Sequence, residues 1–338
     1  MSIENKIKKE IESFTCQMNK RIATIGTTAR TSQSFAVLPR RQALGFQAIN
    51  FLIEDPESAK TCMKYLDGKV RYLLIDIELK KNIDLMTLAK THIHQSKIHT
   101  YKPNDTTLEA ADMFLRNYFE DQLKDKKILI YGAGNLGTKL ALRLAERGSK
   151  VYLDSRNQSK TIEIVRVLNY LLPRQSKNFI KSVQDPQELS SKMDVFIAFT
   201  SASNVIPASS LHFMKKNGLA IDGGIDNFTP EFIQKAADYN LQCYRLDVRT
   251  AFPHTVLYLN EHTKNFYQHI QGEIFVDHIR IVAGGIIGFE GDIVVDNISQ
   301  PKQLVGVANG TGGLKLLDEY TSSDHTNVRY VQEKIIIE

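Results

Sequence analysis

Short apolar runs separated by amphipathic stretches occupy the middle of the chain. Six of these runs have the length and apolar content of buried strands. They are "KKILI", "KVYLD", "NFIKSV", "DVFIAF", "GLAID" and "LQCYRL". Between them, helical periodicity appears near residues 158–170, 208–217 and 230–238. This alternation predicts an α/β fold, a doubly wound parallel sheet covered by helices.

The front of the chain shows the same alternation on a smaller scale. The pattern predicts strands at "RIATIG", "AINFLIE" and "VRYLLIDIELK". It predicts helices at the N-terminus and at "FAVLPRRQALGF", "DPESAKTCMKYL" and "NIDLMTLAKTHI". The stretch "KIHTYKPND" is expected to be extended, and Thr106 with Glu109 is a candidate capping box for a helix over residues 107–120. A small α/β domain therefore precedes the central sheet.

The tail of the chain has a third pattern. Alternating "DIVVDN" and "LVGVAN" predict added strands in a glycine-rich region. We therefore expect an N-terminal α/β domain over residues 1–120, the doubly wound sheet over 121–250, and a C-terminal extension with extra strands over 251–338.

Composition and charge narrow the classes of function. A chain of 338 residues, 42% hydrophobic and 24% charged, is typical of a soluble globular protein with more than one domain. The net charge of +5 is spread along the sequence, so it is weak evidence for nucleic acid and fits an anionic small ligand equally well. Cys16, Cys62 and Cys243 lie far apart without metal-type spacing, which favours reduced thiols in a cytoplasm and no metal site. No apolar segment is long enough to span a membrane, and a homo-oligomer is compatible with the sequence.

The stretch "YGAGNLG" carries the clearest chemistry. Gly132, Gly134 and Gly137 follow a strand and open a helix, with Asn135 and Leu136 at its start. In such a turn the first glycine permits the tight bend, the second lets the backbone approach a pyrophosphate, and the third allows the helix to pack closely. Amide groups at the start of the helix then face the phosphates. We expect this turn to bind a dinucleotide.

The end of the next strand bears on the choice of dinucleotide. Asp154 lies 22 residues beyond Gly132, where a carboxylate binds the ribose hydroxyls of NAD. Ser155 and Arg156 follow at once, and a guanidinium pairs well with the 2′-phosphate of NADP. Neighbours on a strand point in opposite directions, so Asp154 can turn away while the next residues bind the phosphate. We expect NADP(H), with NAD(H) as the alternative. Thr200 and Ser201 follow the fourth strand and are candidates for contact near the nicotinamide.

Four further residues resemble the site of a known family. The loop "GTTARTSQS" resembles the N-terminal loop of shikimate and quinate dehydrogenases, which ends in a Ser-x-Ser pair that binds the substrate carboxylate. This resemblance implies that Ser32 and Ser34 bind substrate. "YLLIDIELK" and "PNDTT" resemble the segments that carry the family's catalytic lysine and aspartate, which implies catalytic roles for Lys80 and Asp105. The resemblance covers roughly residues 20–240. The chain departs from the family pattern at Thr31 and Phe35, where the family has histidine and proline.

The residues and the resemblance together predict an NAD(P)-dependent dehydrogenase or reductase. Its front domain would bind a small carboxylated or polyhydroxylated metabolite beside the dinucleotide domain. Lys80, oriented by a nearby carboxylate, would transfer the proton that accompanies the hydride. A pterin-bound one-carbon unit, an amino-acid-derived imine, or dinucleotide binding without catalysis are the alternatives. A solvated helix-start lysine and a turn aspartate are the structural interpretations of Lys80 and Asp105.

Overall fold

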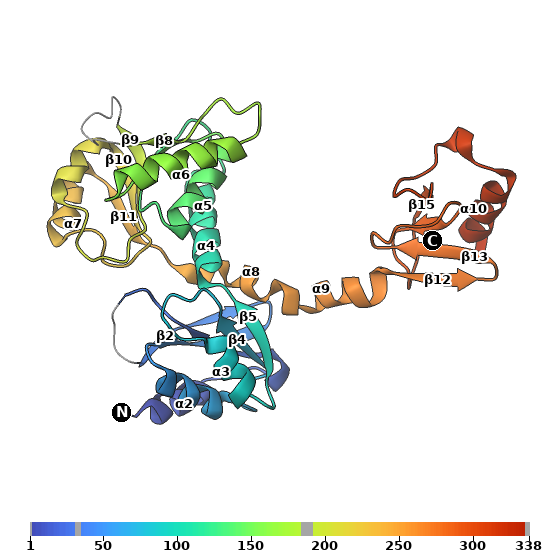
Figure 1. The fold of residues 1–338 in the computed structure, drawn as a ribbon, viewed down its shortest axis with the longest axis horizontal. Helices are drawn as coiled ribbons and strands as arrows, with labels where there is room; N and C mark the ends of the chain where they lie inside the picture. Colours follow the sequence, from blue (N-terminus) through green and yellow to red (C-terminus); the bar gives the residue numbers. More distant parts are fainter. Residues whose placement is uncertain (1, 31–34, 184–191, 335–338) are drawn as a thin grey trace. The chain divides into compact units, whose positions relative to one another are not determined.

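The computed structural model describes residues 2–30, 35–183 and 192–334. The chain divides into two compact units, residues 1–255 and 256–338. Each unit has sheets and core of its own, and Figure 1 shows the elements of each. Within the described residues, no helix has the length and apolar character needed to cross a membrane.

The first sheet of unit 1 is built from the front of the chain (Figure 1). Its strands run in the order β2-β3-β1-β4-β5. They are β1 Arg21–Gly26, β2 Phe35–Ala43, β3 Phe46–Ile53, β4 Tyr72–Asp76 and β5 Lys97–Tyr101. β2 is antiparallel to β3, and the other neighbours are parallel. Helices α1 Ile3–Glu12, α2 Pro56–Leu66 and α3 Leu85–His92 belong to this part, and its buried core includes Ile25, Ile49 and Leu73.

The helix expected over residues 35–46 is wrong, because this segment is the β2 strand of a hairpin. Leu44 and Gly45 both have positive φ, 51° and 79°, as a tight two-residue hairpin turn requires. The pairing register shifts between Leu38 and Arg41, on either side of Pro39. A proline cannot donate to the ladder and is tolerated at such an irregularity.

The second sheet has the predicted doubly wound form. Its six strands run in the order β11-β10-β9-β6-β7-β8 and are all parallel. They are β6 Lys127–Tyr131, β7 Lys150–Asp154, β8 Lys181–Ser182, β9 Met193–Ala198, β10 Met214–Asp222 and β11 Gln242–Arg245. Helices α5 Asn135–Glu146, α6 Gln158–Leu171 and α7 Pro230–Ala236 follow β6, β7 and β10. The helix expected near 208–217 is instead a 3-10 turn, Ala208–Phe213, followed directly by β10.

Helix α4, Pro103–Tyr118, joins the two sheets (Figure 1). It begins earlier than the expected helix over 107–120, with Lys102 at its N-cap and a proline in its first turn, so the Thr106–Glu109 capping box is wrong. Leu108, Ala111 and Leu115 lie in the core of the second sheet. The helix therefore starts at the edge of one sheet and packs against the other.

Charged side chains also link α4 to α5, in three successive rungs. Asp105 pairs with Lys139 at 2.9 Å and Glu109 with Arg143 at 2.8 Å. Asp112 accepts two hydrogen bonds from Arg147, at 2.9 and 2.7 Å, and its carboxylate is nearly buried. We call these pairs the α4–α5 ladder. It fixes α5, the helix that follows the Gly-rich turn, against α4.

Unit 2 contains a small mixed sheet of order β12-β13-β14-β15. Its strands are β12 Gly272–Val276, β13 Ile279–Ala283, β14 Ile293–Val295 and β15 Leu304–Val307. The strands expected at "DIVVDN" and "LVGVAN" are confirmed as β14 and β15. Helix α10, Ser322–Lys334, contributes Val331 to the core. The short helices α8 Phe252–Val256 and α9 Glu261–Asn265 precede this sheet along the chain.

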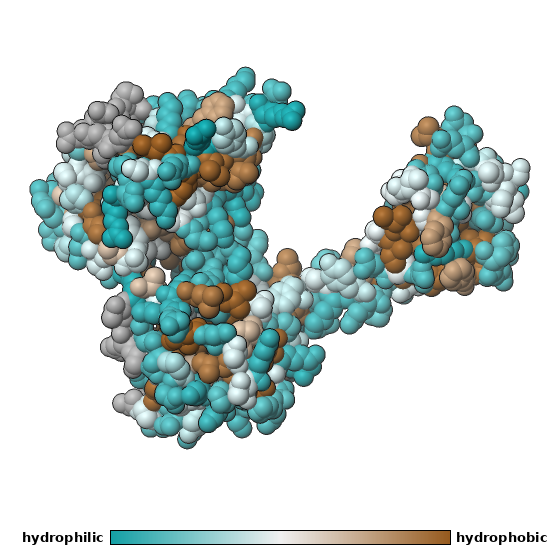
Figure 2. Space-filling model, in the orientation of Figure 1, coloured by the Kyte–Doolittle hydropathy of each residue, from teal (hydrophilic) through white to brown (hydrophobic). Residues whose placement is uncertain are grey.

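The molecular surface is mainly hydrophilic on the face that Figure 2 shows, with separate apolar patches. Large apolar side chains at the end of α6 belong to the exposed set, with Tyr170 77% and Leu171 60% exposed. The buried apolar residues form separate clusters under the individual sheets.

Candidate dinucleotide and substrate site

The order of the second sheet defines where a ligand would bind. β6 has β7 on one side and β9 on the other, so the chain direction across the sheet reverses at β6. In open parallel sheets, ligands bind at this point, beyond the carboxyl ends of the strands. The Gly-rich turn follows β6 and the loop 199–206 follows β9. The two loops touch: the amide of Phe199 donates to the carbonyl of Tyr131 at 2.8 Å.

Two glycines of the turn are required by the fold. Gly132 has φ of 122°, and a Cβ there would overlap with the carbonyl oxygen of Phe199. A Cβ on Gly137 would overlap with the carbonyl oxygen of Gly132, where α5 packs on the turn. Both positions therefore need glycine because of neighbouring backbone.

Gly134 is different, because the protein gives it room. A Cβ built there has no heavy atom within 4 Å among the described residues, and its φ of −93° suits any residue. Gly134 is the N-cap of α5, and no side chain caps this helix. The first backbone amide of α5 that forms a hydrogen bond within the helix is that of Thr138, which donates to the Gly134 carbonyl at 3.0 Å. The amides of Asn135, Leu136 and Gly137 thus precede the first helical bond, and the geometry fits a pyrophosphate.

The residues after β7 form a polar corner next to this turn. Asp154 is only 6% exposed, and its carboxylate accepts a hydrogen bond from Gln158 Nε2 at 2.7 Å. Burial raises the pKa of Asp154, although the hydrogen bond from Gln158 opposes this shift. Gln158 Oε1 is the one buried side-chain oxygen or nitrogen in the described part of the chain that has no partner.

Ser155 and Arg156 differ in their hydrogen bonding. The Ser155 hydroxyl shares a hydrogen bond with Thr161 at 2.7 Å and helps to shape the start of α6. Arg156 is exposed, and within residues 2–30, 35–183 and 192–334 it forms no hydrogen bond or ion pair. Its guanidinium is thus free to bind a phosphate, while Asp154 is turned into the protein.

A second polar group lies at the carboxyl edge of the first sheet. Asp76, at the end of β4, is 4% exposed. Its carboxylate accepts from the Thr27 amide at 3.0 Å, the Glu78 amide at 2.8 Å and Lys80 Nζ at 3.5 Å. Lys80 Nζ also pairs with Glu78 Oε2 at 2.6 Å, and its side chain is only 15% exposed. Lys80 is therefore held between two carboxylates. The alternative interpretation, a solvated lysine at the start of a helix, is wrong.

The structure does not pair Lys80 with Asp105. Asp105 lies in the first turn of α4, and its carboxylate binds Lys102 at 2.5 Å and Lys139 at 2.9 Å. Burial acts to raise the pKa of Asp105, but the hydrogen bonds from the two lysines leave it below its usual value. The two groups are nevertheless linked, because the amide of Asn104 donates to Glu78 Oε2 at 3.0 Å. The carboxylates that orient Lys80 are Asp76 and Glu78, and not that of Asp105.

Ser32 and Ser34, the predicted substrate-binding pair, lie outside the described residues. Arg30, at the described end of the same loop, reaches the second sheet. It donates to the Thr200 carbonyl and to Ser203 Oγ, both at 3.4 Å. Thr200 and Ser201 lie in the loop after β9, as expected, and Thr200 Oγ1 bonds the Ala202 amide at 3.0 Å. The first sheet thus contacts the loop predicted to lie near the nicotinamide.

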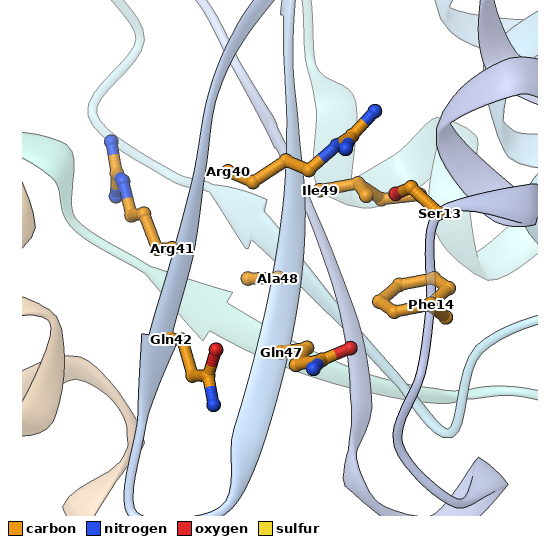
Figure 3. Close-up of a pocket in the computed structure, with 8 residues that line it drawn as sticks. All are labelled: Ser13, Phe14, Arg40, Arg41, Gln42, Gln47, Ala48 and Ile49. Carbon is orange, nitrogen blue, oxygen red and sulfur yellow. The ribbon is translucent and has the colours of Figure 1, made fainter.

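One cavity lies away from these residues. It has a volume of about 230 Å³ and is lined by Ser13, Phe14, Arg40, Arg41, Gln42, Gln47, Ala48 and Ile49 (Figure 3). Figure 3 shows Arg40 and Arg41 pointing to opposite sides of β2. Arg40 pairs with Glu10 at 2.7 Å and Arg41 donates to the Tyr101 hydroxyl at 2.8 Å. Because internal partners already hold both guanidinium groups, this cavity is a weaker candidate than the Gly-rich turn.

A comparison with protein families agrees with the dinucleotide-binding function expected of the second sheet. Residues 127–227 match the family described as NAD-dependent glycerol-3-phosphate dehydrogenase N-terminus. This match covers β6 to the loop after β10, and it supports a nicotinamide dinucleotide as cofactor and an oxidoreductase as the general class. No curated protein matches the chain significantly in sequence.

Solved structures show likeness at low identity. L-tryptophan dehydrogenase from Nostoc punctiforme is 11% identical, with 73% of this chain and 78% of that chain covered and a TM-score of 0.45. Shikimate dehydrogenase from Aquifex aeolicus is 18% identical over 70% and 91% of the chains, with a TM-score of 0.43. Ornithine carbamoyltransferase from Pyrococcus furiosus is 13% identical over 77% and 92%, also with 0.43. Because a transferase stands beside dehydrogenases at equal scores, these likenesses decide neither reaction nor substrate.

Proposed function

We propose that the protein is an oxidoreductase that uses NADP(H) in preference to NAD(H). The observation that carries this proposal is the open space at Gly134 above the uncapped start of α5. Neither backbone geometry nor packing requires glycine there, so a ligand that approaches the backbone supplies the reason for it. The amides at the start of α5 would bind the pyrophosphate, and the helix dipole favours its negative charge.

The corner after β7 supports the phosphate-bearing cofactor. Asp154 is buried and bonded to Gln158, so its carboxylate does not face a bound 2′-phosphate. Arg156 is exposed and free to pair with that phosphate.

We assign the proton transfer to Lys80. The nicotinamide, when bound, supplies hydride chemistry. Asp76 and Glu78 hold the Lys80 ammonium in place from two sides, and Nζ gives or takes the proton at the substrate. Arg30 would bind a carboxylate or hydroxyl of a small carboxylated or polyhydroxylated metabolite, since its two contacts at 3.4 Å are long and go to neutral groups. Asp105 acts in the α4–α5 ladder, which positions the turn relative to Glu78.

A cofactor titration tests this proposal. The chain has no tryptophan, so the fluorescence of the bound reduced nucleotide can be followed without that background. Wild type should bind NADPH at least several-fold more tightly than NADH. Arg156→Ala should weaken NADPH binding by about 1.5–3 kcal/mol, the value of a charge-assisted pair, and leave NADH nearly unchanged.

Arg166→Ala is the matched control, because Arg166 is an exposed arginine within α6, ten residues beyond Arg156. It removes the same charge and should change neither affinity. Preference for NADH in the wild type, unchanged in Arg156→Ala, would identify Asp154 as the residue that selects the cofactor and refute the NADP assignment. Absence of binding to either nucleotide would refute the oxidoreductase proposal.

A further inference from the structure

One buried side chain joins the loop after β9, residues 199–206, to the loop after β10, residues 223–228. Asn227 follows β10 and is 0% exposed. Its Oδ1 accepts from the Thr200 amide at 3.1 Å, and its Nδ2 donates to the Thr200 and Ala202 carbonyls at 3.1 and 2.9 Å. A single amide side chain thus bonds the main chain of the loop after β9 at three points.

The backbone of Asn227 adds to this connection. Its carbonyl accepts from the amides of Val205 and Ile206 at 2.9 and 3.0 Å, and its amide donates to Asp222 Oδ2 at 3.0 Å. The loop 199–206 is therefore bonded to the loop 223–228 along most of its length. A Cβ on Gly224 would overlap with Asn227 Oδ1 and the Thr200 carbonyl, so the two loops are in close contact.

The loop after β10 adopts a strained backbone where it meets this side chain. Ile225 has φ of 70° and Asp226 has φ of 54°. The left-handed region is rare for a β-branched residue, and surrounding contacts must hold it. The Asp226 carbonyl accepts from the Asn204 amide at 2.7 Å, so bonds to the loop after β9 help to hold this conformation. Such strain is concentrated at functional sites.

The position of these loops gives them a function. If the pyrophosphate lies on the Gly-rich turn and the adenosine ribose at Asp154 after β7, the other half of the dinucleotide extends over β9 and β10. The loop that Asn227 holds is therefore the platform for the nicotinamide half. Arg30 of the front domain binds the same Thr200 carbonyl, so the platform also meets the substrate side.

We infer that Asn227 is a positioning residue, which fixes the loop 199–206 as the docking surface for the nicotinamide half of the cofactor. This inference rests on the proposed dinucleotide function. Asn227 touches no reacting atom; it acts through the main chain of Thr200 and Ala202. Aspartate cannot replace it, because a carboxylate accepts from the Thr200 amide but cannot donate to the two carbonyls.

Two ligands that differ only in the nicotinamide half separate this role from general stability. NADPH and 2′-phospho-ADP-ribose share the adenosine phosphate and the pyrophosphate. In the wild type, NADPH should bind more tightly. In Asn227→Ala and Asn227→Asp, the affinity for NADPH should fall by about tenfold or more, to that of 2′-phospho-ADP-ribose, whose own affinity should change less than twofold.

Asn50→Ala is the matched control. Asn50 is also 0% exposed and donates to a main-chain carbonyl, that of Pro39 at 2.8 Å, but it lies in the first sheet. It should leave the ratio of the two affinities unchanged, with circular dichroism melting to show that each variant is folded. An unchanged ratio in the folded Asn227 variants, an equal loss for both ligands, or a wild-type ratio near one would overturn the inference. If the wild type bound neither ligand, the proposed function itself would fail, and the two failures are thus distinct.

Discussion

Replacing Gly134 by alanine should weaken cofactor binding at least tenfold without disturbing the fold. The added methyl group meets no heavy atom within 4 Å in the part of the chain that the structure describes, and the extended backbone at this position, φ −93° and ψ −166°, is open to alanine. Gly134 directly precedes Asn135 and Leu136, whose amides we expect to bind the pyrophosphate. A pyrophosphate bound there would have to move away from the helix start.

The two effects differ in size. Glycine to alanine at a compatible site stabilises a protein by about 0.4–1 kcal/mol through the unfolded state. Alanine is a poorer N-cap than glycine by a comparable amount, so the net change in the free energy of unfolding should stay within about 1 kcal/mol. Loss of even one charge-assisted hydrogen bond to a phosphate costs about 1.5–3 kcal/mol, or roughly 10- to 150-fold in Kd.

Urea unfolding and NADPH titration of the same preparations measure both effects. Gly132→Ala provides the contrast, because its φ of 122° and the overlap with the Phe199 carbonyl predict a damaged fold. Wild-type affinity for NADPH in Gly134→Ala would show that the pyrophosphate does not lie on this turn. Severe loss of stability in that variant would show that the protein, and not a ligand, requires the glycine.

Substitutions of one lysine and two aspartates test the first sheet and the ladder. Lys80→Ala should lower turnover of an identified substrate by roughly a hundredfold or more, with NADPH affinity intact. Lys80→Arg should not restore turnover, because a guanidinium group does not release its proton. A loss of turnover well under tenfold in Lys80→Ala would show that Lys80 does not transfer the proton. Asp112→Asn should lower the free energy of unfolding in urea by about 2–3 kcal/mol. This is below the roughly 3–5 kcal/mol of a fully buried pair, because the arginine side chains are about 30% exposed and can be hydrated. Asp105→Asn, whose carboxylate is 42% exposed, should lower it by less than about 1 kcal/mol, and equal losses in the two variants would contradict this account of the ladder.

The sequence predicted the second sheet well because its central strands are buried on both faces. Parallel buried strands are nearly continuous apolar runs, which short windows detect readily. The β2–β3 hairpin was missed because Arg40, Arg41 and Gln42 interrupt the alternation of β2 beside a register shift. The start of α4 was misplaced because Pro103 was read as part of a turn, although proline is favoured in the first turn of a helix.

The candidate site was predicted where a motif is local and missed where partners are distant in sequence. The Gly-rich turn lies within seven residues, so its geometry follows from its own sequence. Asp76 bonds Thr27 across 49 positions, and Asn227 bonds Thr200 across 27. Neither residue belongs to a periodic pattern, and only the order of the strands brings it to the site. The glycine pair at 223–224, directly after a strand, was the one local sign of a close approach there.

The path through α4 has a consequence for the order of events in a catalytic cycle. One end of this helix is bonded to Glu78, which holds Lys80, and the ladder along its length holds α5, whose start faces the expected phosphates. A helix transmits displacement along its axis with little bending. A shift of α5 on cofactor binding would therefore move α4 and, through it, the Glu78 carboxylate that binds Lys80. Filling the dinucleotide site first would then adjust the proton donor before substrate arrives. Kinetics with two substrates should show an ordered mechanism in which the nucleotide binds first and leaves last.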